Sequence, residues 1–142
     1  MDTIKIIRKF HSCHLAIKWA KAYDDPCVAW ERCDRGDWLL WISAKLGVDR
    51  RTIVLSACAC AHTALKYVPQ GEDRPRLAIE IAEAWCRGEA TIEDVRRSSR
   101  AAYAAAYADA DVAYAARTRS GRKSADLVRS IIPWEKVAEK LT

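Results

Sequence analysis

Five glycines and four prolines divide this chain, and almost all of them fall where helical segments would begin or end. No stretch between them shows the alternation of polar and apolar residues that a half-buried strand requires. The pattern therefore predicts an all-α fold. The predicted helices span residues 5–23, 26–33, 38–46, 50–67, 75–87, 92–117, 124–132 and 134–141.

Residues that can cap helices stand at several of the predicted starts. Asp24 or Asp25 can cap the helix that has Pro26 in its first turn, and Asp49 can cap the helix that begins after it. The segment 91–94 reads as a capping box before a long alanine-rich helix. These local signals support the predicted boundaries.

Residues 53–68 are predicted to form the centre of the fold. Small and apolar side chains, mainly alanine and cysteine, cover nearly the whole circumference of this helix, so other helices should surround it. The helix over residues 75–87 should also be mostly buried, with Leu77 and Trp85 on its broad apolar face. We therefore expect one compact bundle of about six to eight helices around a central Ala/Cys-rich helix.

Length and composition fit one globular domain. The chain has 142 residues, of which 51% are apolar and 30% charged, so residues 1–142 are expected to form a single helical domain. Charges stand close together at the N-terminus, and no segment is apolar for long enough to cross a membrane, so we expect a cytoplasmic protein. The net charge of +5 favours an acidic partner without identifying it.

The sequence predicts no catalytic residues, no metal and no cofactor. The six cysteines are accompanied by no export signal, so reduced core thiols are expected rather than disulfides. A zinc site is disfavoured because the histidines and cysteines near the N-terminus lack two close ligand pairs. These residues are His11, Cys13, His14, Cys27 and Cys33.

Cys58 and His62 offer one catalytic hypothesis. They are four residues apart and share a helical face, which permits a cysteine nucleophile activated by a histidine. The alternative is a buried thiol beside a core histidine, since a reactive cysteine needs an accessible and electropositive setting. We favour the buried thiol, because the chain also lacks the phosphate loop, nucleophile elbow and zinc-helix patterns of enzymes.

The alanine-rich segment 92–117 carries the first candidate site. On one continuous helix, Tyr103, Tyr107 and Tyr114 would lie within about 40° of one another, with Arg96 and Arg100 extending the same stripe. Such a face can anchor a protein partner or stack on a base. The alternative is that the tyrosines pack on neighbouring helices with only their hydroxyls at the surface.

A second candidate site combines aromatic and charged residues. Trp38 and Trp41 are three residues apart, and they can fill the core or clamp a flat ligand. Arg74, Arg76 and Glu80 can form a polar lock between helices or contact a ligand. As a set, these five residues predict a site for a small anionic molecule such as a signalling nucleotide, within one chain or between the two chains of a homodimer.

Six short segments and one further residue, spread over most of the chain, carry a family resemblance. They are GDWLLW (36–41), LSACACA (55–61), YVPQGEDRPRLAIE (67–80), AW (84–85), ADLVR (125–129), IPW (132–134) and Val137. With these segments the chain resembles the helical immunity proteins of the fifth-numbered immunity-protein-like group, which occur with bacterial polymorphic toxins and in phages. The resemblance implies an all-helical fold and a role in neutralising a toxin, and it supplies no catalytic residues.

The sequence favours a non-enzymatic binding protein that neutralises a macromolecular partner. That partner would be a protein toxin or, for a phage-encoded chain, a bacterial defence effector. The first alternative is sequestration of the small anionic ligand. The second is nucleic-acid binding, which ranks last because nineteen acidic residues are interspersed and no known motif is present. Its basic stretch consists of Arg117, Arg119, Arg122, Lys123 and Arg129.

Overall fold

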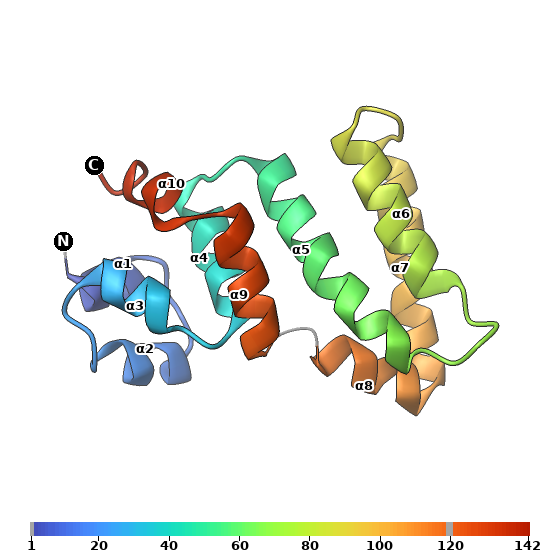
Figure 1. Cartoon of the computed structure of the whole chain (residues 1–142), viewed down its shortest axis with the longest axis horizontal. Coiled ribbons are helices and arrows are strands. Elements are labelled where there is room, and N and C mark those ends of the chain that lie inside the picture. The colour runs from blue at the N-terminus through green and yellow to red at the C-terminus, as the bar shows by residue number, and fades with distance from the viewer. Residues whose placement is uncertain (1, 119–120) are drawn as a thin grey trace.

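The computed structural model describes residues 2–118 and 121–142, and within them every regular element is a helix (Figure 1). The predicted all-α fold is therefore confirmed. The described residues form ten α-helices and one 3-10 helix, slightly more than predicted. They are α1 (Thr3–Lys9), α2 (His14–Ala20), α3 (Pro26–Arg32), α4 (Gly36–Leu46), α5 (Arg50–Ala64), η1 (Leu65–Tyr67), α6 (Arg74–Cys86), α7 (Ile92–Ala108), α8 (Ala110–Thr118), α9 (Arg122–Ile131) and α10 (Trp134–Ala138).

Several predicted helix ends are confirmed by their capping contacts. The backbone N–H of Thr52 donates to the Asp49 carboxylate at 3.1 Å and so caps the start of α5. Thr91 and Asp94 form the predicted capping box, in which each side chain accepts from the other residue's backbone N–H at 3.1 and 3.0 Å. Gly47 ends α4 with a φ of 84°, a conformation that suits glycine.

The single helix predicted over residues 5–23 is wrong. The structure divides this segment into α1 and α2, which pack against each other around a turn at residues 10–13. His11 has a φ of 53° in this turn, in the left-handed region that no α-helix can continue through. The apolar residues of α1 and of α2 each follow a helical period. The same period is expected of one long helix, so periodicity alone does not reveal the break.

The long helix predicted over residues 92–117 is also wrong, because it ends at Asp109. Asp109 is extended, with φ −137° and ψ 122°, and its carboxylate accepts from the backbone N–H of Asp111 at 2.8 Å and of Val112 at 3.3 Å. A side chain that bonds its own following backbone competes with helix continuation and caps a new helix. The segment therefore forms α7 and α8, which point in different directions (Figure 1).

Helix α5 lies in the middle of the fold, as predicted. It packs against α4 and α9 on one side and against α6 on the other, and α8 meets it near its C-terminal end (Figure 1). Two details differ from the prediction, because Leu55 of α5 is exposed and α6 is not mostly buried. The reason is that α6 lies at the edge of the molecule, where it packs on α5 and α7 and leaves Leu77 exposed.

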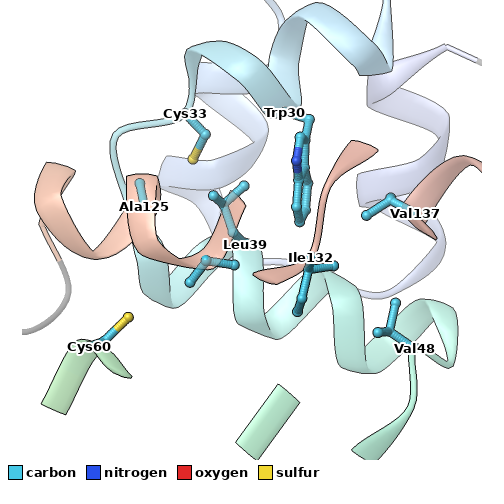
Figure 2. Close-up of a cluster of buried hydrophobic side chains, with 9 residues drawn as sticks. Trp30, Cys33, Leu39, Val48, Cys60, Ala125, Ile132 and Val137 are labelled. Atoms are coloured by element: carbon cyan, nitrogen blue, oxygen red, sulfur yellow. The ribbon is translucent and has the colours of Figure 1, made fainter. Parts of the chain in front are cut away.

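The main core joins the two ends of the chain. Figure 2 shows Trp30 of α3, Leu39 of α4 and Val137 of α10 gathered around Ile132, which follows the last residue of α9. These residues are nearly or fully buried. The segments before residue 47 and after residue 121 thus form one half of the molecule, and α6, α7 and α8 form the other.

None of the helices in the described part of the chain has both the length and the apolar character that a membrane crossing requires.

Candidate partner-binding face

Tyr103 and Tyr107 are the most exposed aromatic side chains that the structure describes. Both project from α7, with exposed fractions of 72% and 86%, and their ring centroids are 6.1 Å apart. A tyrosine that serves the core would bury most of its ring. The packed alternative is therefore wrong for these two residues, and their rings form an aromatic surface that the fold itself does not use.

Tyr114 does not belong to the same stripe. The break at Asp109 places it on α8, where its ring packs edge-on against Tyr67 with 5.4 Å between centroids. Tyr114 remains half-exposed. The alignment of three tyrosines on one helix, predicted from a continuous α7, is therefore corrected to a pair on α7 and a separate residue on α8.

Arg96 and Arg100 lie on α7 at helical spacing before the two tyrosines, and both are exposed. Arg96 forms an ion pair with Glu93, three residues earlier. Such an exposed pair contributes little to stability, so Arg96 can exchange it for a partner's carboxylate. We call Arg96, Arg100, Tyr103 and Tyr107 the α7 face.

An apolar groove of about 340 Å³ adjoins the α7 face, and Tyr103 lines it. Its walls come from α5, α6, α7 and α8 and consist mainly of small side chains. This groove was not predicted from the sequence. The signal was present as alanines on facing sides of three helices, namely Ala57, Ala61, Ala78, Ala82, Ala102 and Ala106.

Cys58 lines this groove but lacks the setting of a nucleophile. Its thiol is buried and contacts the backbone carbonyl of Ile79 at 3.9 Å. Burial, and then the negative charge of Glu83, raise the pKa of Cys58 to about 12. His62 contacts the Glu83 carboxylate at 2.9 Å instead of activating the thiol. These contacts favour the buried thiol over the cysteine nucleophile. The burial of Cys58 is confirmed, but His62 is exposed, so the predicted core histidine is wrong.

We expect Cys58 to resist alkylation by iodoacetamide at pH 8 by at least about 100-fold relative to the exposed Cys13. At that pH a thiol with a pKa of about 12 is deprotonated in only about one molecule in ten thousand, and the thiolate is the reactive form. Peptide mapping of partly labelled protein measures both rates. Labelling in urea, where both thiols are exposed, is the control, and equal rates in the folded protein would contradict the assigned pKa.

The second predicted site is divided between two parts of the structure. Trp38 and Trp41 of α4 line a cavity among the N-terminal helices. Arg74, Arg76 and Glu80 belong to α6, and none of them lines that cavity. Arg76 donates to Glu80 at 2.7 Å.

Arg74 is likewise held by an ion pair. It donates twice to Glu72, at 2.8 and 2.7 Å, and these bonds lower the pKa of Glu72 to about 2. Both arginines of the predicted anion site thus form ion pairs with carboxylates of the chain itself, and neither lies near the two tryptophans of that site.

The basic stretch near the C-terminus is divided as well. Arg122 and Lys123 are exposed at the start of α9, and Arg119 lies outside the described residues. Arg129 turns inward, with 15% of its side chain exposed, and donates to backbone carbonyls of the α3 end. A role in phosphate binding is therefore wrong for Arg129, which weakens the nucleic-acid hypothesis.

The cysteines and histidines form neither disulfides nor a metal-binding cluster among the described residues. All six cysteines are free thiols, of which Cys33, Cys58 and Cys60 are buried. Across residues 2–118 and 121–142, no group of three or more histidine, cysteine or acidic side chains is placed to hold a metal ion.

The structure thus defines an all-helical protein with an exposed aromatic surface beside an apolar groove. Residues 47–125, more than half of the chain, match the family model described as Imm-5 like putative immunity protein, so the chain belongs to this family. The matched residues run from α5 to the start of α9 and include the α7 face and the groove. No curated protein and no solved structure matches the chain.

Proposed function

We propose that this chain is a non-enzymatic immunity protein that neutralises a protein toxin in the cytoplasm of a bacterial cell by binding it through the α7 face. Membership of the immunity-protein family supports a protein partner. A phage-encoded chain of this kind would act in the same way on a bacterial defence effector. In both cases the protein blocks its partner by covering it, and no bond is made or broken.

The observation that carries the proposal is the exposure of Tyr103 and Tyr107 beside an apolar groove. Tyrosine is enriched among the residues that dominate interface energies, because a large rigid ring loses little conformational entropy when it is buried. Two exposed rings on one rigid helix are already positioned for a partner. A partner that covers them gains apolar burial without a change of fold.

The chemistry of the face suggests what the partner presents. Arg96 and Arg100 lie along α7 next to the rings, and the chain as a whole has a net charge of +5. An acidic surface would therefore be attracted to the face and held in register by the arginines. The groove beside Tyr103 has the size to receive one or two apolar side chains from the same surface.

We expect the double substitution Tyr103→Ala and Tyr107→Ala to weaken binding of the native partner at least about ten-fold, because anchor residues typically cost more than 1 kcal/mol when truncated. The partner is first recovered by pull-down from the native host, then purified, and its affinity is measured by calorimetry. Stability should change by less than about 0.5 kcal/mol, since both rings are exposed.

Leu15→Ala is the matched control, because Leu15 is an exposed apolar residue, 62% accessible, on α2 in the other half of the molecule. It should leave the affinity unchanged. The proposal fails if the native host yields no stoichiometric protein partner. It fails equally if the purified partner binds the tyrosine variant and the unmodified chain with the same affinity.

A further inference from the structure

A second cavity lies in the half of the molecule that the family match does not cover. It has a volume of about 370 Å³, is partly open to solvent, and is enclosed by α1, α2, α3, α4 and α10. Its lining residues all lie before residue 47 or after residue 125. Small-molecule sites in proteins commonly have volumes of about 300–1,000 Å³, so this cavity has the size of a ligand site.

The cavity walls are unusually aromatic. Five of the six tryptophans of the chain line it, and Trp85 is the exception. Trp19 and Trp38 meet edge to face with 5.9 Å between ring centroids. Flat aromatic walls select flat guests, because stacked and edge-on ring contacts are favourable only between planar groups.

Two polar atoms in these walls are buried without a hydrogen-bond partner among the described residues. They are the indole Nε1 of Trp30, coloured blue in Figure 2, and the hydroxyl oxygen of Ser12. Trp30 is only 4% exposed, so bulk water does not satisfy its N–H. Native structures rarely leave buried donors unpaired, and each such group requires an explanation. A ligand that accepts a hydrogen bond supplies one.

The charges around the cavity point to an uncharged ligand. No lysine or arginine is among the described residues that line it, and His11 is the one basic side chain there, so an anion would find no permanent counter-ion. The Asp37 carboxylate at the wall already accepts two hydrogen bonds from Arg35, at 3.0 and 2.6 Å, so a cation would find no free carboxylate. The Arg35 guanidinium also lies over the Trp38 ring, 4.6 Å from its centroid, which closes one edge of the aromatic wall.

We propose that this cavity binds a neutral, planar, aromatic small molecule that carries a hydrogen-bond acceptor directed at the Trp30 indole N–H. The site is separate from the α7 face and does not depend on the proposed immunity function. It differs from the anion site predicted from the sequence, because it contains Trp38 and Trp41 but none of the arginines of that set.

Quinoline and naphthalene form a matched pair of probes, since they share size and shape and only quinoline has an acceptor nitrogen. We expect quinoline to bind about three- to ten-fold more tightly than naphthalene, as one added neutral hydrogen bond predicts. Two-dimensional ¹H–¹⁵N NMR resolves the tryptophan indole N–H signals. The Trp30 signal should move most with quinoline, and the Trp85 signal should stay in place.

Trp30→Phe keeps an aromatic wall but removes the N–H, so it should abolish the preference for quinoline. Trp85→Phe, outside the cavity, is the matched control and should leave the preference intact. The proposal is overturned if neither probe gives saturable shifts, if the two bind equally well, or if quinoline moves the Trp85 signal more than the Trp30 signal. The two NMR titrations of the unmodified chain decide the matter even if Trp30→Phe fails to fold.

Discussion

Replacing Arg129 with alanine is expected to lower the free energy of unfolding by about 2–4 kcal/mol, a large effect for a residue with a charged side chain near the surface. Its Nη1 donates to the backbone carbonyls of Trp30 at 2.9 Å and of Cys33 at 2.7 Å. Helix α3 ends at Arg32, so the carbonyls of its last turn lack amide partners within the helix. Arg129 supplies that partner from α9.

The loss of stability arises because the substitution leaves two backbone carbonyls without a hydrogen-bond donor. Trp30 and Cys33 are both nearly fully buried, so their carbonyls would face an apolar core with no donor. Each unsatisfied buried group costs about 1–3 kcal/mol, and the lost packing of the arginine stem adds to this. Urea denaturation followed by tryptophan fluorescence measures the change in unfolding free energy.

Three further variants separate this mechanism from a simple loss of charge. Asp126→Ala removes the other partner of Arg129, 2.7 Å away but exposed, and should cost less than about 1 kcal/mol. Arg122→Ala, exposed on the same helix, should change stability by less than about 0.5 kcal/mol. Arg129→Lys should give an intermediate loss, because an ammonium lacks the fixed fork of a guanidinium. Equal losses for Arg129→Ala and Arg122→Ala would contradict the capping role.

Arg129 also illustrates what the sequence can and cannot predict. An arginine on an amphipathic helix near other basic residues has the same pattern whether it faces solvent or turns inward. The Arg129 side chain turns inward because the C-terminal end of α3 lies beside it. Almost a hundred residues separate Arg129 from that end of α3 in the chain. Local patterns contain no information about such a distant carbonyl.

Helix starts were predictable where the cap is local. Asp49 and Thr91 bond backbone groups three residues away, so short sequence windows contain both partners. The breaks at His11 and Asp109 were missed for a related reason. Neither is a glycine or proline, and both lie between segments with continuous helical periodicity, so only the backbone geometry distinguishes a hairpin or a new cap from a longer helix.

The candidate site was predictable in part. Helical spacing correctly placed Tyr103 and Tyr107 on one face, because both lie on the unbroken part of α7. Spacing could not show that this face is exposed, since amphipathic aromatic residues suit a core boundary equally well. The tryptophan-lined cavity was predictable only through Trp38 and Trp41. Its other walls depend on the meeting of residues that are distant in the chain, such as Trp30 and Trp134.

Gly36→Ala is expected to destabilise the fold by about 1–2 kcal/mol, although helix propensity alone predicts the opposite sign. Gly36 is the first residue of α4, where alanine is intrinsically better by up to about 1 kcal/mol. A Cβ at this position would lie 2.7 Å from Cβ and 2.8 Å from the backbone carbon of Ser124 on α9. Ser124 is nearly fully buried and its backbone cannot rotate away, so overpacking of about 1–3 kcal/mol should outweigh the gain in propensity.

Ser124→Gly tests the cause, because it removes the side-chain half of the clash. In a double-mutant cycle followed by urea denaturation, it should recover about 1 kcal/mol of the loss caused by Gly36→Ala. Gly47→Ala is the control at the other end of α4, where a Cβ meets no atom within 4 Å and any loss comes from the positive φ. Ser124→Gly should not rescue that variant. A Gly36→Ala protein as stable as the unmodified chain would contradict the close contact between α4 and α9 at Gly36 and Ser124.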